Sequence, residues 1–447
     1  MLSKKIKTAW IVTVDMGYGH QRAAYPFKSI AEGGEIITAN DYPGIPEKDK
    51  LIWTDSRMLY EFISRFKKVP FIGDKIFEFY DQLQTIPAFY PRRDLSKSNI
   101  QLKQTYELFR KADWGKHLID KLAKKPRPLV TTFFVTAMMA EYFNYPGEIY
   151  CILCDADISR TWVPPKPKDS RIIYLASNRR VEERLKLYGV DASRIFLTGF
   201  PLPNENVGLH LKTIKEDLGR RLIQLDPQKI YINRYKKTLV GQLGSKKLKM
   251  SSSRPVTITF CVGGAGAQRE LGMEIAQSLK QEIIDGQFNL NLVAGVNIDV
   301  EKYFRQEIAK IGLDKFLGKN IKIVFNAKKD DYFIDFNKCL RTTDILWTKP
   351  SELSFYCGLG LPIIMAPPIG SQEEFNRKWL ESIGAGMDQE DPKYVNEWLV
   401  DWLKSGWLAE ASMQGYTEAP KHGTFNIKKI VFHEYEEVKS IHTVLQY

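Results

Sequence analysis

The chain has 447 residues, of which 44% are hydrophobic and 12% aromatic, so it is long and apolar enough for two globular domains and is not intrinsically disordered. Its net charge of +12 suits anionic ligands such as nucleotides, phospholipid headgroups or nucleic acid, although a soluble protein with a basic surface fits the same value. Five cysteines exclude a disulfide framework and favour a reducing compartment.

The beginning of the chain, MLSKKIKTAWIVTV, passes from lysines directly into a strand pattern and has no small-residue cleavage site, so we expect no signal peptide. Apolar runs such as residues 129–140 are shorter than the roughly 20 residues that a membrane-spanning helix needs. We therefore expect a cytoplasmic protein, and any membrane contact is expected to be peripheral.

Residues 9–14 form an apolar run that predicts a buried strand, and DMGYGH at 15–20 follows it. Apolar residues at helical spacing come next, so the pattern predicts a strand, a glycine turn and a helix. Gly17 and Gly19 allow a ligand to approach the backbone closely. Gly-x-Gly alone is a weak signal, because a dinucleotide fingerprint needs a third glycine where this chain has Arg22 or Ala23.

Residues 51–125 are rich in aromatic and basic residues at helical spacing and are interrupted by prolines. Two interpretations of this insertion stay open: a helical core packed on the sheet, or a surface that faces an acceptor or a membrane. The aromatic residues concerned are Tyr60, Phe62, Phe66, Phe71, Phe77, Phe79 and Tyr80.

Further strands are predicted at 128–135, 148–153, 171–175 and 194–197, with a helix at 179–188 that ends at Gly189. Cys151 and Cys154 form a CxxC within a strand pattern. Side chains three positions apart in a strand point to opposite faces, so we expect two core thiols rather than a zinc or redox pair. This half of the chain is expected to be an α/β domain.

The strand pattern restarts at 256–262 and enters Gly263-Gly264-Ala265-Gly266, which precedes a helix pattern and strands at 290–294 and 321–325. Strands at 344–347 and 361–366 follow, each with a polar loop after it, at 348–354 and 367–376. In parallel α/β sheets, ligands bind at the carboxyl ends of the strands. These two loops therefore predict a binding site.

The same patterns predict the domain boundaries. Residues 1–203 form the first domain, with the insertion at 51–125, and a basic connecting segment covers 204–254. Residues 255–415 form the second domain, which includes a helix at 394–408, and a tail at 416–447 is expected to pack back on the first domain.

Four segments, in order, resemble the GT-B glycosyltransferases related to monogalactosyldiacylglycerol synthase and to the peptidoglycan N-acetylglucosaminyl transferase. DMGYGHQRAA is similar to their N-terminal glycine-rich loop, and residues 154–202, with Trp-Val-Pro and Thr-Gly-x-Pro, are similar to the diacylglycerol-type branch. CVGGAGAQREL and TKPSELSFYCGLGLPIIMAPPIGSQEEFNRKWLESIGAG resemble the second lobe. The resemblance covers most of 8–45, 128–202 and 255–390. It implies a GT-B fold, α/β with two Rossmann-like domains facing a central cleft, the acceptor side in the N-terminal domain.

The chain departs from the family pattern in the turn after Lys349-Pro350, which is two residues shorter. Phe355 then aligns with a glutamate that contacts ribose in relatives. Glu352 aligns with that glutamate instead if the alignment gap is moved along the turn.

The resemblance implies an inverting, metal-independent transfer of a hexose from a nucleotide sugar, UDP-linked, to a hydroxyl of a lipid or glycan acceptor, with no cofactor. The acceptor must lose a proton, and His20 is the expected general base because histidine is the side chain whose unperturbed pKa lies near neutral pH. The diphosphate leaving group needs donors that stabilise its growing charge. The expected donor-side residues are Gly263, Gly264, Ala265, Gly266, Arg269, Lys349, Ser351, Glu352, Gln372 and Asn376; the acceptor-side residues are Gly17, Gly19, Asp155 and Asp157.

Structural explanations stay open beside these roles. His20 can merely hydrogen-bond its turn, the glycines at 263–266 can serve tight strand-to-helix packing, and Glu352 can be a helix-start residue. Asp155-Ala156-Asp157 is a DxD, a metal-binding signature of the other large glycosyltransferase fold, but we expect no metal here because it lies mid-chain.

Two rival functions stay open: a nucleotide-sugar 2-epimerase, which uses the same lobes without an acceptor, and a non-catalytic nucleotide-sugar-binding protein, suggested by the shortened turn. We expect no nucleic acid partner, because the basic residues are scattered and no known module is present. Should the acceptor be a lipid, the inner face of a membrane is the expected place of action.

Overall fold

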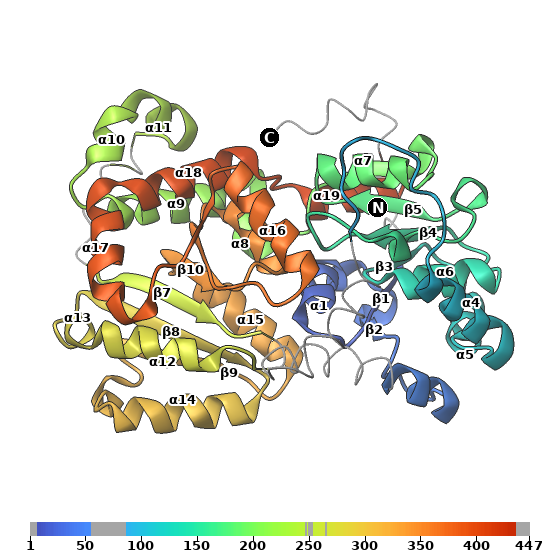
Figure 1. The fold of residues 1–447 in the computed structure, drawn as a ribbon, viewed down its shortest axis with the longest axis horizontal. Coiled ribbons are helices and arrows are strands. Elements are labelled where there is room, and N and C mark those ends of the chain that lie inside the picture. Colours follow the sequence, from blue (N-terminus) through green and yellow to red (C-terminus); the bar gives the residue numbers. More distant parts are fainter. Residues whose placement is uncertain (1–6, 55–85, 246–247, 249–253, 264–265, 435–447) are drawn as a thin grey trace, which may run out of the picture. The chain divides into compact units, whose positions relative to one another are not determined.

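The computed structural model describes residues 7–54, 86–245, 248, 254–263 and 266–434, which form two compact α/β units (Figure 1). Unit 1 contains the described residues up to Leu202, Ile369–Asn376 and the residues from His422 on; unit 2 contains Pro203–Pro368 and Arg377–Lys421. The seven aromatic residues named for the insertion, together with Gly264, Ala265 and residues 435–447, lie outside the described residues.

The sheet of unit 1 is parallel, with the order β2-β1-β3-β4-β5-β6. Its strands are β1 Trp10–Thr13, β2 Ile37–Thr38, β3 Leu129–Thr131, β4 Ile149–Ile152, β5 Ile173–Ala176 and β6 Ile195–Leu197. The helices are α1 Tyr18–Ala24, η1 Tyr25–Ile30, η2 Glu32–Gly34, α4 Ile100–Ala112, α5 Lys116–Ala123, α6 Phe134–Tyr142, η3 Arg160–Trp162, η4 Pro167–Asp169, α7 Arg179–Leu187, η5 Ala192–Arg194 and α19 Gly423–Val431.

The sheet of unit 2 is also parallel, with the order β12-β11-β10-β7-β8-β9. Its strands are β7 Val256–Cys261, β8 Phe288–Gly295, β9 Ile321–Phe325, β10 Ile345–Thr348, β11 Ile363–Met365 and β12 Gly386–Asp388. The helices are α8 Asn204–Val207, η6 Leu209–Leu211, α9 Lys212–Leu225, α10 Ile230–Arg234, α11 Lys236–Leu243, α12 Arg269–Ser278, α13 Lys280–Ile284, α14 Ile298–Lys310, η7 Asp314–Phe316, α15 Lys329–Leu340, η8 Glu352–Leu359, η9 Pro392–Tyr394, α17 Val395–Ser405 and α18 Trp407–Glu418; α16 Ser371–Ser382 is shared between the units.

Both sheets have Rossmann-like topology, so the predicted fold class is confirmed. Renumbered from β7, the order in unit 2 is 3-2-1-4-5-6, the dinucleotide-fold order, whereas unit 1 has the flavodoxin-like start 2-1-3-4-5. Helices α12 to α14 lie on one side of the unit 2 sheet and α9 and α18 on the other (Figure 1). Central strands such as β4 are buried along their whole length, as parallel strands covered on both faces require.

Two local expectations differ from the structure. The predicted strand at 128–135 ends at Thr131, and α6 begins at Phe134, because the chain turns at Thr132 and Phe133. The three-residue strand β12 was not predicted, since so short a run carries no alternation that a sequence pattern can detect. Cys151 and Cys154 are free and buried, as expected of core thiols.

Long-range hydrogen bonds fix one helix of the expected connecting segment 204–254 and one helix of the expected tail 416–447. Arg221 of α9 is 2% exposed and donates to the backbone oxygens of Thr343, Leu359 and Gly360, each at 2.9 Å, so α9 is part of the unit 2 core. In unit 1, Asn426 of α19 donates to the backbone oxygen of Thr198 at 3.0 Å. Among the described residues, no helix is both long and apolar enough to cross a membrane.

Candidate active site

Each sheet has a point where the strand order reverses, and ligands of open α/β sheets bind beside the carboxyl ends of the strands at such a point. In unit 1 the reversal lies between β1 and β3, which pair directly, with Val12 opposite Thr131. In unit 2 it lies between β7 and β10, where Cys261 is opposite Thr348. The loops that follow these four strands are therefore the expected ligand-binding loops.

His20 lies at the reversal point of unit 1. It belongs to α1, after β1, and its Nδ1 is 2.7 Å from the backbone oxygen of Thr132, in the loop after β3. A carbonyl oxygen only accepts hydrogen bonds, so Nδ1 is the donor and carries the proton. In the neutral ring Nε2 is then the basic nitrogen. In this tautomer the ring can accept a proton at Nε2.

Aromatic rings and a polar network hold this turn in place. The His20 ring is 5.0 Å from the ring of Phe133 and 6.2 Å from that of Trp162. Gln21 donates to the Asp15 carboxylate at 2.9 Å. Gly17 has a φ of 95°, a conformation that L residues with a side chain rarely adopt, and it begins the helix that carries His20. Phe133 and Thr132 were not predicted, because backbone acceptors and packing rings leave no motif.

The two aspartates of the DxD, Asp155 and Asp157, have different surroundings in the structure. Asp157 is 1% exposed, and its carboxylate accepts from Arg184 Nε and Nη2, each at 2.8 Å, and from Arg180 Nε at 3.0 Å. Arg184 is itself fully buried. The Asp157 carboxylate is therefore bound by two arginines, and we do not propose it as an acceptor-side residue. Asp155, after β4, is half-buried.

Asn376 also proves structural. It is fully buried; its Oδ1 accepts from the backbone N–H of Ala156 at 2.7 Å, and its Nδ2 donates to Asp155 Oδ1 at 3.1 Å. Both ends of the amide are used within unit 1, so the expected contact with a donor sugar is replaced by a role that fixes the loop after β4. Gln372, one turn earlier in α16, is half-buried and belongs to the same unit.

In unit 2, Lys349 and Gly263 meet at the reversal point. A Cβ built on Gly263 would lie 3.0 Å from Lys349 Cε, so the lysine chain crosses directly over the glycine. Gln268 Nε2 donates to the backbone oxygen of Pro367 at 2.9 Å, which ties the loop after β7 to the loop after β11. The structure thus brings the Lys349 side chain and the Gly263 backbone together after β10 and β7.

Gly263 and Gly266 precede helix α12. Helix α12 begins at Arg269, three residues after Gly266, and the Gly266 N–H is already used in a 2.8 Å bond to the Gly263 oxygen. Gly263 and Gly266 therefore both lie before the helix and do not supply its first N–H groups. Arg269 is partly exposed, and its guanidinium lies 4.4 Å from the Tyr303 ring.

Glu352 and Phe355 both lie in η8. Glu352, 8% exposed, is in its first turn, directly after Ser351, whose side chain makes no cap. Phe355 is 2% exposed and packs on Trp379 with ring centroids 4.8 Å apart. Phe355 is thus a core residue, and Glu352 is the one carboxylate between Lys349 and Gly360 in the sequence.

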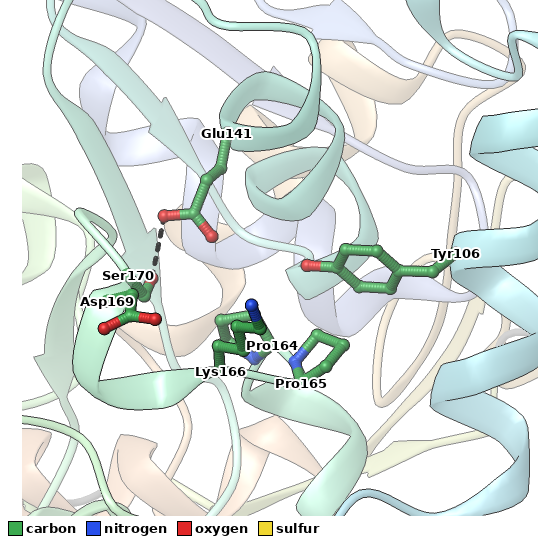
Figure 2. Close-up of a pocket in the computed structure, with 7 residues that line it drawn as sticks. All are labelled: Tyr106, Glu141, Pro164, Pro165, Lys166, Asp169 and Ser170. Carbon is green, nitrogen blue, oxygen red and sulfur yellow. Dashed lines mark hydrogen bonds between the residues drawn. The ribbon is translucent and has the colours of Figure 1, made fainter.

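A separate cavity of about 270 Å³ lies in unit 1. Its walls come from Tyr106 of α4, Glu141 at the end of α6 and the segment 164–170 before β5 (Figure 2). The Glu141 carboxylate accepts from Ser170 Oγ at 2.8 Å and the backbone N–H of Arg171 at 2.7 Å. These residues precede strands, so the cavity is at the amino edge of the sheet, opposite His20.

Over the described residues, no group of three or more His, Cys, Asp or Glu side chains is arranged to hold a metal ion. Residues 242–425 match the family described as Domain of unknown function (DUF6938). The fold and the two reversal points together define the chain as a two-domain α/β protein with the topology expected of a GT-B enzyme.

Among characterised proteins, the chain is similar to the processive diacylglycerol beta-glucosyltransferase of Bacillus pumilus (strain SAFR-032), with 21% identity over 397 residues; the match covers 85% of this chain and 82% of the relative. The predicted resemblance to GT-B glycosyltransferases is confirmed by this match, which spans both units.

Several solved structures are also similar. Acinetobacter baumannii MurG has a TM-score of 0.45 and 12% identity, covering 95% of this chain and 99% of its own. The UDP-GlcNAc 2-epimerase of Neisseria meningitidis, bound to UDP-GlcNAc, has a TM-score of 0.44 and 12% identity, covering 81% and 88%. Anabaena Alr3699/HepE, in complex with UDP, has a TM-score of 0.40 and 13% identity, covering 74% and 84%.

Proposed function

We propose that the protein is an inverting glycosyltransferase that moves a hexose from a UDP-linked sugar to a hydroxyl of a lipid acceptor of the diacylglycerol class. The diacylglycerol glucosyltransferase relative supports the reaction class and the lipid acceptor over a glycan. The single observation that carries the catalytic assignment is the 2.7 Å bond from His20 Nδ1 to the Thr132 oxygen, because it leaves Nε2 as the base.

The proposed step is one displacement. The acceptor oxygen attacks the anomeric carbon and forms the new glycosidic bond, while the bond from that carbon to the diphosphate breaks and UDP leaves with the electron pair. His20 Nε2 takes the hydroxyl proton. Attack from the side opposite the leaving group inverts the configuration.

We assign binding of the UDP-sugar donor to unit 2. The ammonium of Lys349, which lies over Gly263, stabilises the negative charge that grows on the diphosphate. Glu352 is assigned to the ribose hydroxyls, since it follows β10 and is the carboxylate nearest Lys349 in sequence. As the family resemblance implies, no metal takes part. Gly17 and Asp155 are assigned to the acceptor side.

The test has two steps. A panel of nucleotide sugars is first screened for a rise in the unfolding temperature, because any ligand that binds only the folded state stabilises it. The best donor is then incubated with and without a diacylglycerol acceptor, and released UDP is measured. UDP release that depends on the acceptor supports the proposal. Release without acceptor, with a 2-epimerised sugar, indicates an epimerase, and stabilisation with no release indicates a non-catalytic binder.

A further inference from the structure

The positive charge of the chain is concentrated in one stretch. Residues 227–254 contain eight Lys and Arg residues and no Asp or Glu, so they supply +8 of the total of +12. Four of these cations are in or next to the short helices α10 and α11: Lys229, Arg234, Lys236 and Lys237. All four are exposed, and no ion pair between described residues involves them. Such a cluster is a binding surface for an anionic partner.

The two helices are anchored firmly enough to present that charge. Asp226, 1% exposed, accepts from the backbone N–H groups of Ile230 and Ile232 at 2.8 and 2.7 Å. Tyr231 packs against Gly406, where an added Cβ would lie 3.1 Å from the tyrosine Cβ. Helix α10 is therefore held at the junction of α17 and α18, where Figure 1 shows α10 and α11 at the outer edge of unit 2.

Large apolar side chains are exposed beside the cations. Ile230, Tyr235 and Trp407 are 42%, 40% and 47% exposed. The Tyr235 ring packs on Tyr231 with centroids 4.8 Å apart, and the Trp407 ring packs on Trp402 at 5.0 Å, so both rings are held by a neighbouring ring and are still partly exposed. Trp and Tyr with Lys and Arg around them are the composition of a protein surface that sits at the level of lipid headgroups.

We propose that Lys229, Ile230, Arg234, Tyr235, Lys236, Lys237 and Trp407, here called the α10–α11 surface, dock unit 2 on an anionic lipid membrane. The cations attract the negative surface, and the apolar side chains enter the headgroup region. An exposed aliphatic residue, Ile230, in this set favours lipid over nucleic acid, whose bases stack on rings. The inference deepens the proposed function, on whose lipid acceptor it rests, by naming the membrane face of the protein.

Vesicle sedimentation tests the proposal without requiring turnover. The full chain is mixed with phosphatidylcholine vesicles that contain or lack phosphatidylglycerol. We expect binding to the anionic vesicles, weakened by salt. A variant with Lys229→Gln, Arg234→Gln, Lys236→Gln and Lys237→Gln should lose roughly fivefold in affinity per charge, at about 1 kcal/mol each. Ile230→Ser with Trp407→Ser should weaken the binding that remains at high salt.

The matched control removes four exposed lysines of unit 2 from another face: Lys302, Lys315, Lys319 and Lys322, each changed to Gln. Equal losses in the two quadruple variants, or no binding to anionic vesicles, would overturn the proposal. The proposal would also be overturned if the protein bound a fluorescent oligouridine and did not bind the vesicles. Thermal unfolding of every variant checks that it is folded. UDP release with a detergent-dispersed acceptor is measured in parallel, so that failure of docking and failure of the transferase assignment are seen separately.

Discussion

His20 and Thr132 come from loops after neighbouring strands, 112 residues apart in sequence, and the 2.7 Å bond between them joins the two sides of the reversal point in unit 1. The bond uses a backbone oxygen, so no substitution of Thr132 removes the acceptor. It fixes both the proton position and the ring plane of His20. A base whose orientation is set before substrate binds needs little rearrangement during the reaction.

Replacing His20 tests that base directly. We expect His20→Ala to lower the transfer rate by about 10²–10⁴-fold, the usual contribution of a general base, while UDP affinity changes little because the donor is assigned to unit 2. Acceptor-dependent UDP release gives the rate, and the ligand-induced rise in unfolding temperature gives the affinity.

His117→Ala is the matched control for His20→Ala. His117 lies in the same unit, with Nδ1 2.9 Å from the Tyr42 hydroxyl, and has no assigned part in transfer. Transfer at close to the normal rate in His20→Ala would show that another group accepts the proton.

Lys349 is expected to control donor affinity. Lys349→Met should weaken UDP binding by roughly ten to a hundredfold, the equivalent of about 1.5–3 kcal/mol for a hydrogen bond to a charged group. Gly263→Ala should act in the same direction, because its Cβ would lie 3.0 Å from Lys349 Cε and displace the chain. Titration calorimetry with UDP measures both effects.

For these two variants, Lys302→Met in α14 serves as the control, since it removes an exposed charge from the same unit. Unchanged UDP affinity in Lys349→Met would place the diphosphate elsewhere.

Asn376 should matter for stability and not for donor binding. Asn376→Ala leaves the Ala156 N–H without its acceptor in a buried place, which we expect to cost about 1–3 kcal/mol of unfolding free energy. Urea unfolding measures this loss. Gln372→Ala, half-buried in the same helix, is the comparison. A normal midpoint with lost UDP affinity in Asn376→Ala would return this residue to the donor site.

Sequence patterns predicted most of the fold because buried strands of four or more residues carry a clear signal. β1, β4, β7 and β10 all begin and end within two residues of their predicted bounds. The placement of His20 after a strand and of Lys349 after another could also be predicted, since both follow from strand ends. Asn376 could not, because its partners, Asp155 and Ala156, are more than 200 residues away and share no pattern with it.

The chemistry of single residues was harder to predict than their positions. Asp157 looked like a site residue because a DxD is polar and follows a strand, but its burial depends on Arg184, which stands on the inner face of α7 beside Val181 and Leu185. An arginine on an apolar helix face is a usable signal for a buried partner.

The pair of Asp157 and Arg184 gives a fourth prediction. Asp157→Asn leaves a buried guanidinium without its counterion, and we expect a loss of about 3–5 kcal/mol in unfolding free energy. Replacing both partners, with Asp157→Leu and Arg184→Met, should cost less than the sum of the single changes. A double-mutant cycle by urea unfolding measures the coupling. Additive losses would mean that the two side chains do not interact in solution.

Lys421 gives a prediction for pH. It is 4% exposed, and its Nζ donates to the backbone oxygens of Tyr416 and Ala419 at 2.5 and 3.2 Å. Burial lowers the pKa of Lys421 to about 8. The unfolded chain has the ordinary pKa of about 10.4, so between these values the unfolded state binds more protons and stability rises with pH.

The matching variant is Lys421→Met, which keeps the length of the side chain and cannot titrate. Burial raises the pKa of Cys357 and of several tyrosines, and these groups change stability in the same range, so the difference between the two proteins is the informative quantity. Urea unfolding at pH 8 and at pH 10 should show this difference moving in favour of the parent protein by about 2–3 kcal/mol, at 1.36 kcal/mol per pKa unit. A difference that stays constant over that range would mean that Lys421 is neither desolvated nor held against α18 as the structure describes.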